Sequence, residues 1–152
     1  MKKILYVDMD NVLVDFLTGL RHYDPAIIEG YEGRYDEIPG IFSKMRPMEG
    51  AIDGFALLST HFDTYVLSTS PWENPSAWTD KLVWVKQYLG KYAYKRLILT
   101  HHKNLNVGDF LIDDRKRNGA DRFPGMLIQF GSERFPDWPA VVEHLLPDKK
   151  LL

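Results

Sequence analysis

Short apolar runs alternate with helical patterns along most of this chain, and this alternation restricts the fold more than any other feature. The runs are rich in β-branched and aromatic residues, which is typical of buried strands. They lie at residues 3–8, 64–68, 96–100, 109–113 and 126–130. The helical patterns lie at residues 51–61, 77–89 and 138–146. Strands that alternate with helices predict a parallel sheet covered on both faces, which is a doubly wound α/β domain with five core strands.

The second helical pattern shows how the helices are recognised. Its apolar residues Leu82, Val85 and Leu89 follow steps of three and four residues, which is typical of a helix. With 152 residues in all, the chain has room for one ordinary domain and its core but is short for two. We therefore expect a single domain over residues 1–152.

Composition excludes several classes of partner and site. The net charge of −2 offers no broad attraction to a nucleic acid polymer or to an anionic membrane, so neither is expected as a partner. The chain has no cysteine, which excludes disulfides and thiolate metal sites. Apolar runs stay far below the length of a membrane span. A cytoplasmic protein is the expectation, with the oligomeric state, monomer or homodimer, left open.

One segment interrupts the alternation directly after the first predicted strand. From about residue 14 the chain shows a helical pattern and then "GYEGRYDEIPGIFSKMRPMEG", which is dense in glycine, proline and aromatic residues. Long excursions in a compact α/β domain are often lids or binding loops. We expect residues 16–48 to form a cap over the carboxyl end of the first strand, where open α/β sheets bind ligands.

Acids, hydroxyls and a lysine follow the predicted strands at their carboxyl ends. They are Asp8 and Asp10 after the first strand, Ser68, Thr69 and Ser70 after the second, Lys81 in the following helix, and Asp113 and Asp114 after the fourth. Several carboxylates in one crevice repel one another unless a cation neutralises them, and hard oxygen ligands favour Mg²⁺. Hydroxyl and ammonium groups supply donors for phosphate oxygens. The set indicates phosphoryl transfer, with an aspartate as a candidate nucleophile.

Ordinary structural roles compete with this interpretation. Aspartate is common where a strand ends in a turn, which would account for Asp8 and Asp10 without any chemistry. A calcium-binding loop is excluded, because Val12 and Leu13 occupy the positions where such a loop needs a ligand and a glycine. Asp15 fits a helix cap or a lid contact better than a catalytic role.

Taken together, these stretches resemble the four motifs of the haloacid dehalogenase-like (HAD) phosphohydrolases. The motifs are "DMDNVLVDF", "STSP", a helical lysine and "DFLIDDR", in this order. More specifically, they resemble the 5′(3′)-deoxyribonucleotidases, which pair D-M-D-G-V-L-A-D-F with T-S-P, K-x-x-W-V and L-I-D-D-R. The resemblance covers most of residues 3–115 and is weak after residue 120. It implies a HAD-like doubly wound parallel sheet with a small, mostly helical cap inserted after the first strand.

The resemblance also implies a role for each matching acid. Asp8 would attack phosphorus and form an aspartyl-phosphate. Asp10 would protonate the leaving oxygen and then deprotonate the water that hydrolyses the intermediate. Mg²⁺ would be held by Asp8, the backbone carbonyl of Asp10 and Asp114, while Asp113 would orient the metal shell. The sequence leaves open whether Asp113 and Asp114 exchange these two roles.

The phosphate and the leaving group would be bound by other matching residues. Thr69 and Lys81 would hold the phosphate, with Ser70 assisting. Phe16 and Phe42 match positions that sandwich the base in the family. The chain departs from the family at Asn11, where glycine is usual, although asparagine also tolerates unusual backbone angles. The cap is also shorter than in the animal enzymes.

Three further features are ambiguous. The adjacent histidines in "THHKN" are better explained as a surface loop than as a metal pair, although Lys103 beside them could reach a phosphate. Trp72 follows the hydroxyl loop immediately and is the tryptophan best placed to stack on a base. "RKRNGADR" at residues 115–122 is too brief and interrupted for a nucleic-acid patch and is interpreted as a solvated loop.

Three functions compete. The first is a Mg²⁺-dependent phosphomonoesterase for nucleoside monophosphates, in particular deoxyribonucleotides. The second is the same chemistry on another small phosphate ester, such as a sugar phosphate. The third is a receiver-like signalling domain that stores an aspartyl-phosphate. Receivers place the phosphoacceptor on the third strand, however, and "RLILT" ends without an acid.

Overall fold

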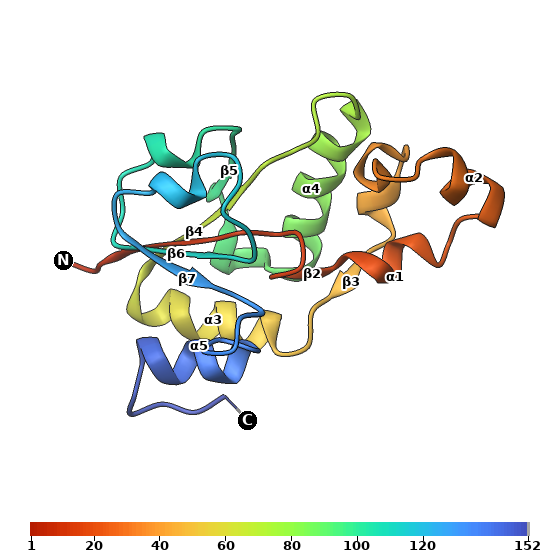
Figure 1. Cartoon of the computed structure of the whole chain (residues 1–152). Helices are drawn as coiled ribbons and strands as arrows, with labels where there is room; N and C mark the ends of the chain where they lie inside the picture. The colour runs from red at the N-terminus through yellow and green to blue at the C-terminus, as the bar shows by residue number, and fades with distance from the viewer. Residues whose placement is uncertain (152) are drawn as a thin grey trace.

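The computed structural model describes residues 1–151, and a five-stranded parallel sheet forms its centre (Figure 1). Its spatial order is β5-β4-β1-β6-β7, with every neighbouring pair parallel. The strands are β1 (Ile4–Val7), β4 (Asp63–Ser68), β5 (Leu97–Leu99), β6 (Phe110–Asp113) and β7 (Met126–Gln129). The doubly wound fold with five core strands, predicted from the alternation of runs, is confirmed, and each strand lies within one residue of its predicted range or inside it.

Helices cover both faces of this sheet. In Figure 1, α3 (Ala51–His61) and α5 (Trp138–Leu145) lie below it and α4 (Pro75–Tyr88) lies above it. Helix α4 begins with Pro75 in its first turn, where the missing N–H of proline costs nothing. Helix α5 begins after Asp137, whose carboxylate accepts a hydrogen bond from the N–H of Ala140 at 3.0 Å. The short 3₁₀ helices outside the cap are η3 (Gly90–Ala93), η4 (Lys103–Leu105) and η5 (Ala120–Arg122).

The helix predicted from steps of three and four residues is α4, but its apolar residues are not all buried. Val85 and Leu89 are buried, whereas Leu82 is 47% exposed. The face that packs inward consists of Ala77, Lys81, Trp84 and Val85. A lysine therefore lies on the buried side of the helix, where its ammonium group needs polar partners.

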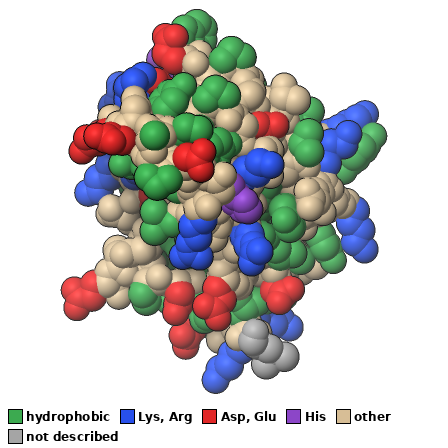
Figure 2. All heavy atoms as spheres, turned by 90° about the vertical axis from the view of Figure 1, so that its right-hand side faces the viewer, with side chains coloured by type: hydrophobic (Ala, Val, Ile, Leu, Met, Phe, Trp, Pro, Cys, Tyr) green, Lys and Arg blue, Asp and Glu red, His purple; other side chains and the backbone are tan. Residues whose placement is uncertain are grey.

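The segment predicted to form a cap, residues 16–48, is connected to the sheet domain by a two-stranded antiparallel ribbon. The ribbon pairs β2 (Val14–Asp15) with β3 (Arg46–Pro47). Between these strands lie α1 (Phe16–Leu20), α2 (Pro25–Gly30), η1 (Tyr35–Glu37) and η2 (Ile41–Ser43). The cap lies beyond the carboxyl ends of the strands (Figure 1). Figure 2 shows this end of the molecule, with basic side chains around a histidine near the centre of the view.

Helix α5 also supports the loop that follows β1. Trp138 is fully buried, and its Nε1–H donates to the carbonyl oxygen of Val12 at 2.8 Å. A Cβ atom on Gly54 would lie 2.5 Å from the Trp138 ring, so only glycine lets α3 approach so closely. Within residues 1–151, no helix has the length and apolar character needed to cross a membrane.

Candidate active site

The loop after β1 turns the chain sharply and leaves two acids at the end of the sheet. The N–H of Asp8 donates to the carbonyl oxygen of Ile112 on β6, which fixes Asp8 at the strand end. The carbonyl oxygen of Met9 accepts from the N–H groups of Leu13 and Val14, both at 2.9 Å. Asn11 takes a left-handed conformation with φ of 58°, so asparagine does serve in place of the usual glycine.

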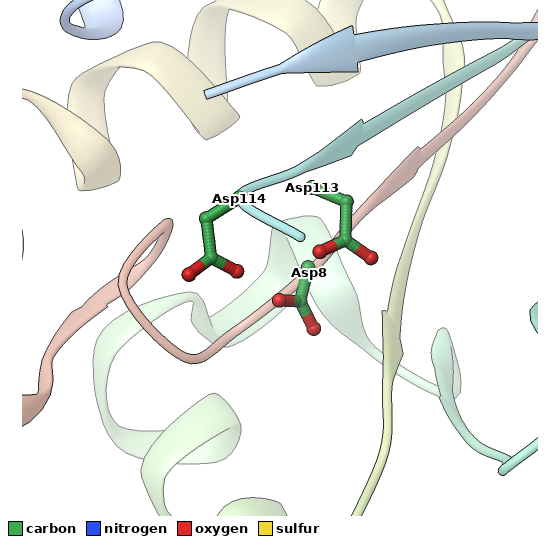
Figure 3. A group of neighbouring side chains, drawn as sticks. All are labelled: Asp8, Asp113 and Asp114. Carbon is green, nitrogen blue, oxygen red and sulfur yellow. The ribbon is translucent and has the colours of Figure 1, made fainter. Parts of the chain in front are cut away.

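Three carboxylates converge where β1 and β6 end side by side (Figure 3). Oxygens of Asp8, Asp113 and Asp114 all lie within 4.8 Å of one another. Asp8 and Asp113 are buried, and Asp114 is partly buried. The adjacency of strands β1 and β6 thus brings together residues more than a hundred positions apart, as the family resemblance implied for Asp8 and Asp114.

Lys103 compensates part of this negative charge. Its Nζ donates to Asp8 Oδ1 at 3.0 Å and to Asp113 Oδ2 at 2.5 Å, and its side chain is nearly inaccessible to solvent. Burial opposes its charge, but the two carboxylates outweigh burial and raise the pKa of Lys103. The sequence placed Lys103 within reach of a phosphate; its pairing with the acids was missed.

Burial and the negative charge that Lys103 does not compensate raise the pKa of the two acids after β6. Burial first, and the charge of Asp8 second, raise the pKa of Asp113 to about 6 and that of Asp114 to about 7. Asp113 is the better compensated of the two, because its Oδ2 accepts from Lys103 and its Oδ1 accepts from the N–H of Arg115 at 3.0 Å. For Asp114, the nearby cation is Arg115, whose Nε lies 3.6 Å away.

A divalent cation fits this donor set. Opposite ligands of an octahedral Mg²⁺ lie about 4.2 Å apart, so oxygens within 4.8 Å of one another can share one ion after small side-chain rotations. Asp114 has oxygens available for an ion, whereas both oxygens of Asp113 already accept hydrogen bonds. The chemistry of the donors, oxygen only, is that which Mg²⁺ prefers.

Asp10 lies beside this cluster and faces Lys81 instead. Lys81 is fully buried, and its Nζ donates to Ser68 Oγ at 2.9 Å and to the carbonyl oxygen of Thr69 at 2.6 Å. Its distance to Asp10 Oδ1 is 3.3 Å, which makes an ion pair. Burial raises the pKa of Asp10, and Asp8 adds to this while Lys81 opposes it. A raised pKa suits a group that carries a proton in one step and gives it up in another.

Lys81 therefore differs from its predicted role. Its ammonium has three partners and no solvent exposure, so direct contact with a phosphate would require it to leave them. The geometry instead makes Lys81 a support for the loop after β4 and for Asp10. Lys103 is the lysine that lines the cleft over the acids.

The loop after β4 brings one of its two predicted hydroxyls to the cleft. Thr69 lines the cleft, and its Oγ1 donates to the carbonyl oxygen of Thr100 at 2.7 Å, which leaves lone pairs but no proton for a ligand. Ser70 is fully buried, and within residues 1–151 its Oγ has no hydrogen-bond partner. Phosphate binding by Thr69 and Ser70 stays a prediction.

The aromatic residues of the cap are less available than predicted. Phe42 is only 1% exposed, because its ring covers the Lys81 ammonium at 4.5 Å and meets the edge of Phe16 at 5.9 Å. The predicted stacking of a base on Phe42 is therefore not possible in this arrangement of the cap. Phe16 is partly exposed, and base binding by Phe16 stays a prediction.

Trp72 is exposed and stays a candidate for base stacking. It is 75% exposed and packs edge-on against Trp78 and His101. Its neighbour Pro71 lines the cleft and accepts a hydrogen bond from Trp78 Nε1 at 3.1 Å, which anchors this loop.

The cleft that contains these groups has a volume of about 240 Å³. Its lining consists of Asp8, Asp10, Asp36, Thr69, Pro71, Lys103, Asp113, Asp114, Arg115, Arg117 and Asn118. Asp36 comes from the cap, and no spacing in the sequence indicated that it would face the acids. Arg115 and Arg117 belong to the segment interpreted as a solvated loop; they are exposed, but they also form one wall of the cleft.

Two solved structures share this architecture. The "putative HAD-hydrolase YfnB from Bacillus subtilis", solved with bound magnesium, superimposes with a TM-score of 0.68 over 95% of this chain and 99% of its own, at 10% identity. A haloacid dehalogenase-like family hydrolase from Xanthomonas campestris gives a TM-score of 0.59 over 95% of this chain and 96% of its own, at 12% identity. At such low identity the likeness establishes the fold: this is a HAD-like α/β domain.

Comparison of the sequence with known proteins identifies the family within this fold. The model of the family "5' nucleotidase, deoxy (Pyrimidine), cytosolic type C protein" matches residues 28–135. A Vibrio phage KVP40 protein named "Putative 5'(3')-deoxyribonucleotidase" is 58% identical over 98% of this chain and 88% of its own length. The human "5'(3')-deoxyribonucleotidase, cytosolic type" is 30% identical over 92% of this chain and 77% of its own. The chain belongs to the 5′(3′)-deoxyribonucleotidase family of phosphoric monoester hydrolases.

Proposed function

We propose that this protein is a Mg²⁺-dependent 5′(3′)-deoxyribonucleotidase that dephosphorylates nucleoside monophosphates through an aspartyl-phosphate on Asp8. The observation that carries the proposal is the convergence of Asp8, Asp113 and Asp114 at the strand ends, with Asp10 in the same cleft. Family membership supports the substrate class.

The residues proposed for the metal are Asp8, Asp114 and the backbone carbonyl of Asp10. Asp113 would orient this set, because both of its oxygens are already engaged by Lys103 and by the N–H of Arg115. When bound, Mg²⁺ would neutralise phosphate oxygens and hold the phosphate in line with its attacker.

Asp8 is the residue proposed to attack phosphorus. One of its oxygens, Oδ1, is held by Lys103, which leaves the other available, and its backbone is fixed to β6. A carboxylate with one oxygen engaged and a fixed main chain is oriented for a single direction of attack. The ammonium group of Lys103 lies beside Asp8 Oδ1. It would therefore also donate to oxygens of a phosphate bound next to Asp8.

Asp10 is the residue proposed to move protons. Its Oδ1 is buried and has no hydrogen bond among residues 1–151, although Lys81 lies within ion-pair distance. Burial raises the pKa of Asp10, which favours a carboxyl group that holds a proton and donates it to the leaving oxygen. As a carboxylate it would then take a proton from the attacking water.

The alternative substrate is a small phosphate ester such as a sugar phosphate. The limited volume of the cleft and the burial of Phe42 favour it over a bulky base-binding site. Storage of a phosphoryl group for signalling is set aside, because the chain belongs to a family of hydrolases. A cytoplasmic location and homodimer formation stay predictions; the human relative is named a cytosolic type.

A substrate screen tests the proposal. Purified protein is assayed with 5′- and 3′-deoxyribonucleotides, the matching ribonucleotides, sugar phosphates and p-nitrophenyl phosphate, each with Mg²⁺ and with EDTA. We expect Mg²⁺-dependent release of phosphate that is fastest with a deoxyribonucleotide. Highest kcat/KM for a sugar phosphate would favour the alternative, and equal rates in EDTA would contradict the metal site.

A further inference from the structure

Asp36, an acid of the predicted cap, lines the same cleft as the acids of the sheet. It lies in η1 and is exposed to solvent, and it is the cap residue among the described residues that line this cleft. The predicted base-binding residues Phe16 and Phe42 do not appear in that lining. Of the cap residues, Asp36 is therefore the one placed to meet a bound ligand.

The backbone around Asp36 is tied to the sheet domain. Asn74, which precedes α4, is buried, and its Nδ2 donates to the carbonyl oxygens of Asp36 at 2.8 Å and Ile38 at 3.0 Å. Ser76 Oγ donates to Asn74 Oδ1 at 2.6 Å and accepts from the N–H of Gly40 at 3.0 Å. Leaving these buried groups unpaired would be costly, so the cap segment keeps its position over the cleft.

We propose that Asp36 determines specificity by selecting leaving groups that offer a hydrogen-bond donor and by rejecting those that carry a second anionic group. This inference rests on the proposed phosphomonoesterase function. A carboxylate accepts hydrogen bonds but donates none, so a sugar hydroxyl or a base N–H suits it and a phosphate does not.

The arrangement of charges supports this choice. The scissile phosphate would lie at the strand ends near Asp8 and Thr69, so the leaving group must extend toward the cap. Two cations of the cleft are paired with acids of the floor: Lys103 with Asp8 and Asp113, and Arg115 with Asp114. The third, Arg117, belongs to the wall formed by the loop after β6. In a cleft of about 240 Å³, a second phosphate on the cap side would lie close to Asp36.

The test compares two substrates that differ only in a second phosphate. The kcat/KM for a deoxynucleoside 5′-monophosphate and for its 3′,5′-bisphosphate is measured in the native protein and in Asp36→Asn. We expect the ratio of bisphosphate to monophosphate to rise roughly ten-fold in Asp36→Asn, equivalent to about 1.4 kcal/mol. This is roughly the interaction expected in water between one negative charge and a dianion about 6 Å away. A ratio within two-fold of the native value would overturn the proposal.

Glu37→Gln is the matched control. Glu37 is the next residue and carries the same charge, but it pairs with Arg34 at 2.6 Å and is not among the described residues that line the cleft. Its substrate ratio should stay at the native value. The same shift in Glu37→Gln as in Asp36→Asn would show a general effect of net charge and would also overturn the proposal.

A second measurement separates this inference from the proposed function. Hydrolysis of p-nitrophenyl phosphate is inhibited with orthophosphate and with pyrophosphate, and the ratio of the two inhibition constants is compared between the native protein and Asp36→Asn. In Asp36→Asn, the inhibition constant of pyrophosphate should fall relative to that of orthophosphate. This result would support Asp36 even if nucleotides proved not to be substrates, and an unchanged ratio would count against it.

Discussion

The floor of the cleft and the cap above it are built in different ways. The floor is made of charged side chains from strand ends, in which Lys103 bridges Asp8 and Asp113. The cap is held by neutral hydrogen bonds from Asn74 and Ser76 and by the burial of Phe42 against Lys81. The floor therefore has a charge balance that a metal or a mutation will disturb strongly. Substitutions in the cap should affect the chemical step less.

The largest effect should come from the floor. Asp8→Asn should lower kcat for every substrate by roughly 10⁴-fold or more, the scale expected when a nucleophile is removed. Circular dichroism should show an intact fold. Asp15→Asn, which changes an acid seven residues away, serves as the control and should keep most of the activity. Near-normal turnover in a folded Asp8→Asn protein would end the nucleophile assignment.

The two buried lysines should differ in their effect on metal binding. Lys103→Met removes the cation that competes for oxygens of Asp8 and Asp113, so Mg²⁺ should bind more tightly although kcat falls by roughly 10²–10³-fold. Lys81→Met should leave the Mg²⁺ affinity near the native value, because Lys81 pairs with Asp10 and the loop after β4. Calorimetric titration with Mg²⁺ measures both. Weaker Mg²⁺ binding in Lys103→Met would show that the lysine supports the metal site instead of competing with it.

Phe42→Ala tests the cap as a packing unit. Removing a buried phenyl ring should destabilise the protein by about 3–5 kcal/mol. Because Phe42 is buried, kcat/KM should fall by a similar factor for nucleotides and for p-nitrophenyl phosphate. Denaturant unfolding and the two assays check this. A loss confined to nucleotides, without loss of stability, would restore the base-stacking role expected from the family resemblance.

The smallest predicted effect concerns pH and stability without metal. The pKa of Asp114 is raised to about 7, so between about pH 4 and pH 7 the folded protein holds a proton that the unfolded chain has released. The free energy of unfolding in EDTA should therefore fall as pH rises through this range. Asp114→Asn should remove part of the slope and be more stable at pH 8 by roughly 1–2 kcal/mol.

Thermal unfolding at pH 5.5 and pH 8 measures this effect, with EDTA and with Mg²⁺. In Mg²⁺ the sign should reverse, because the ion binds the deprotonated acids and its stabilisation grows with pH. A pH slope in EDTA that is identical in Asp114→Asn and in the native protein would contradict the assignment of the shifted pKa.

The sequence predicted the floor better than the cap, for physical reasons. Acids that follow parallel strands meet at one edge of the sheet, and the family resemblance implied that the strands before Asp8 and Asp114 are neighbours. The contacts of Lys81 and Lys103 were harder to predict, because the sequence indicated both lysines only as donors for a phosphate. The sequence did not show that Lys81 lies on the buried face of α4, nor that the loop after β5 returns Lys103 to Asp8.

The cap could not be predicted in the same way because its contacts are long-range and local patterns do not encode them. Phe42 matched a family position, yet the short cap packs its ring against Lys81. Asp36 reaches the cleft because Asn74, 38 residues further along, binds its carbonyl oxygen. Neither contact leaves a periodic or motif signal in the chain.

In the proposed mechanism, Asp8 carries a covalent phosphoryl group while Asp10 moves protons. The most direct measurement is a rapid-mixing assay of Asp10→Asn with p-nitrophenyl phosphate, whose acidic leaving group needs little help from a proton donor. We expect a burst of p-nitrophenolate equal to the enzyme concentration, followed by slow turnover. The peptide that contains Asp8 should then carry phosphate that is stable in acid and released by hydroxylamine. A linear time course without a burst, together with no label on that peptide, would contradict this mechanism.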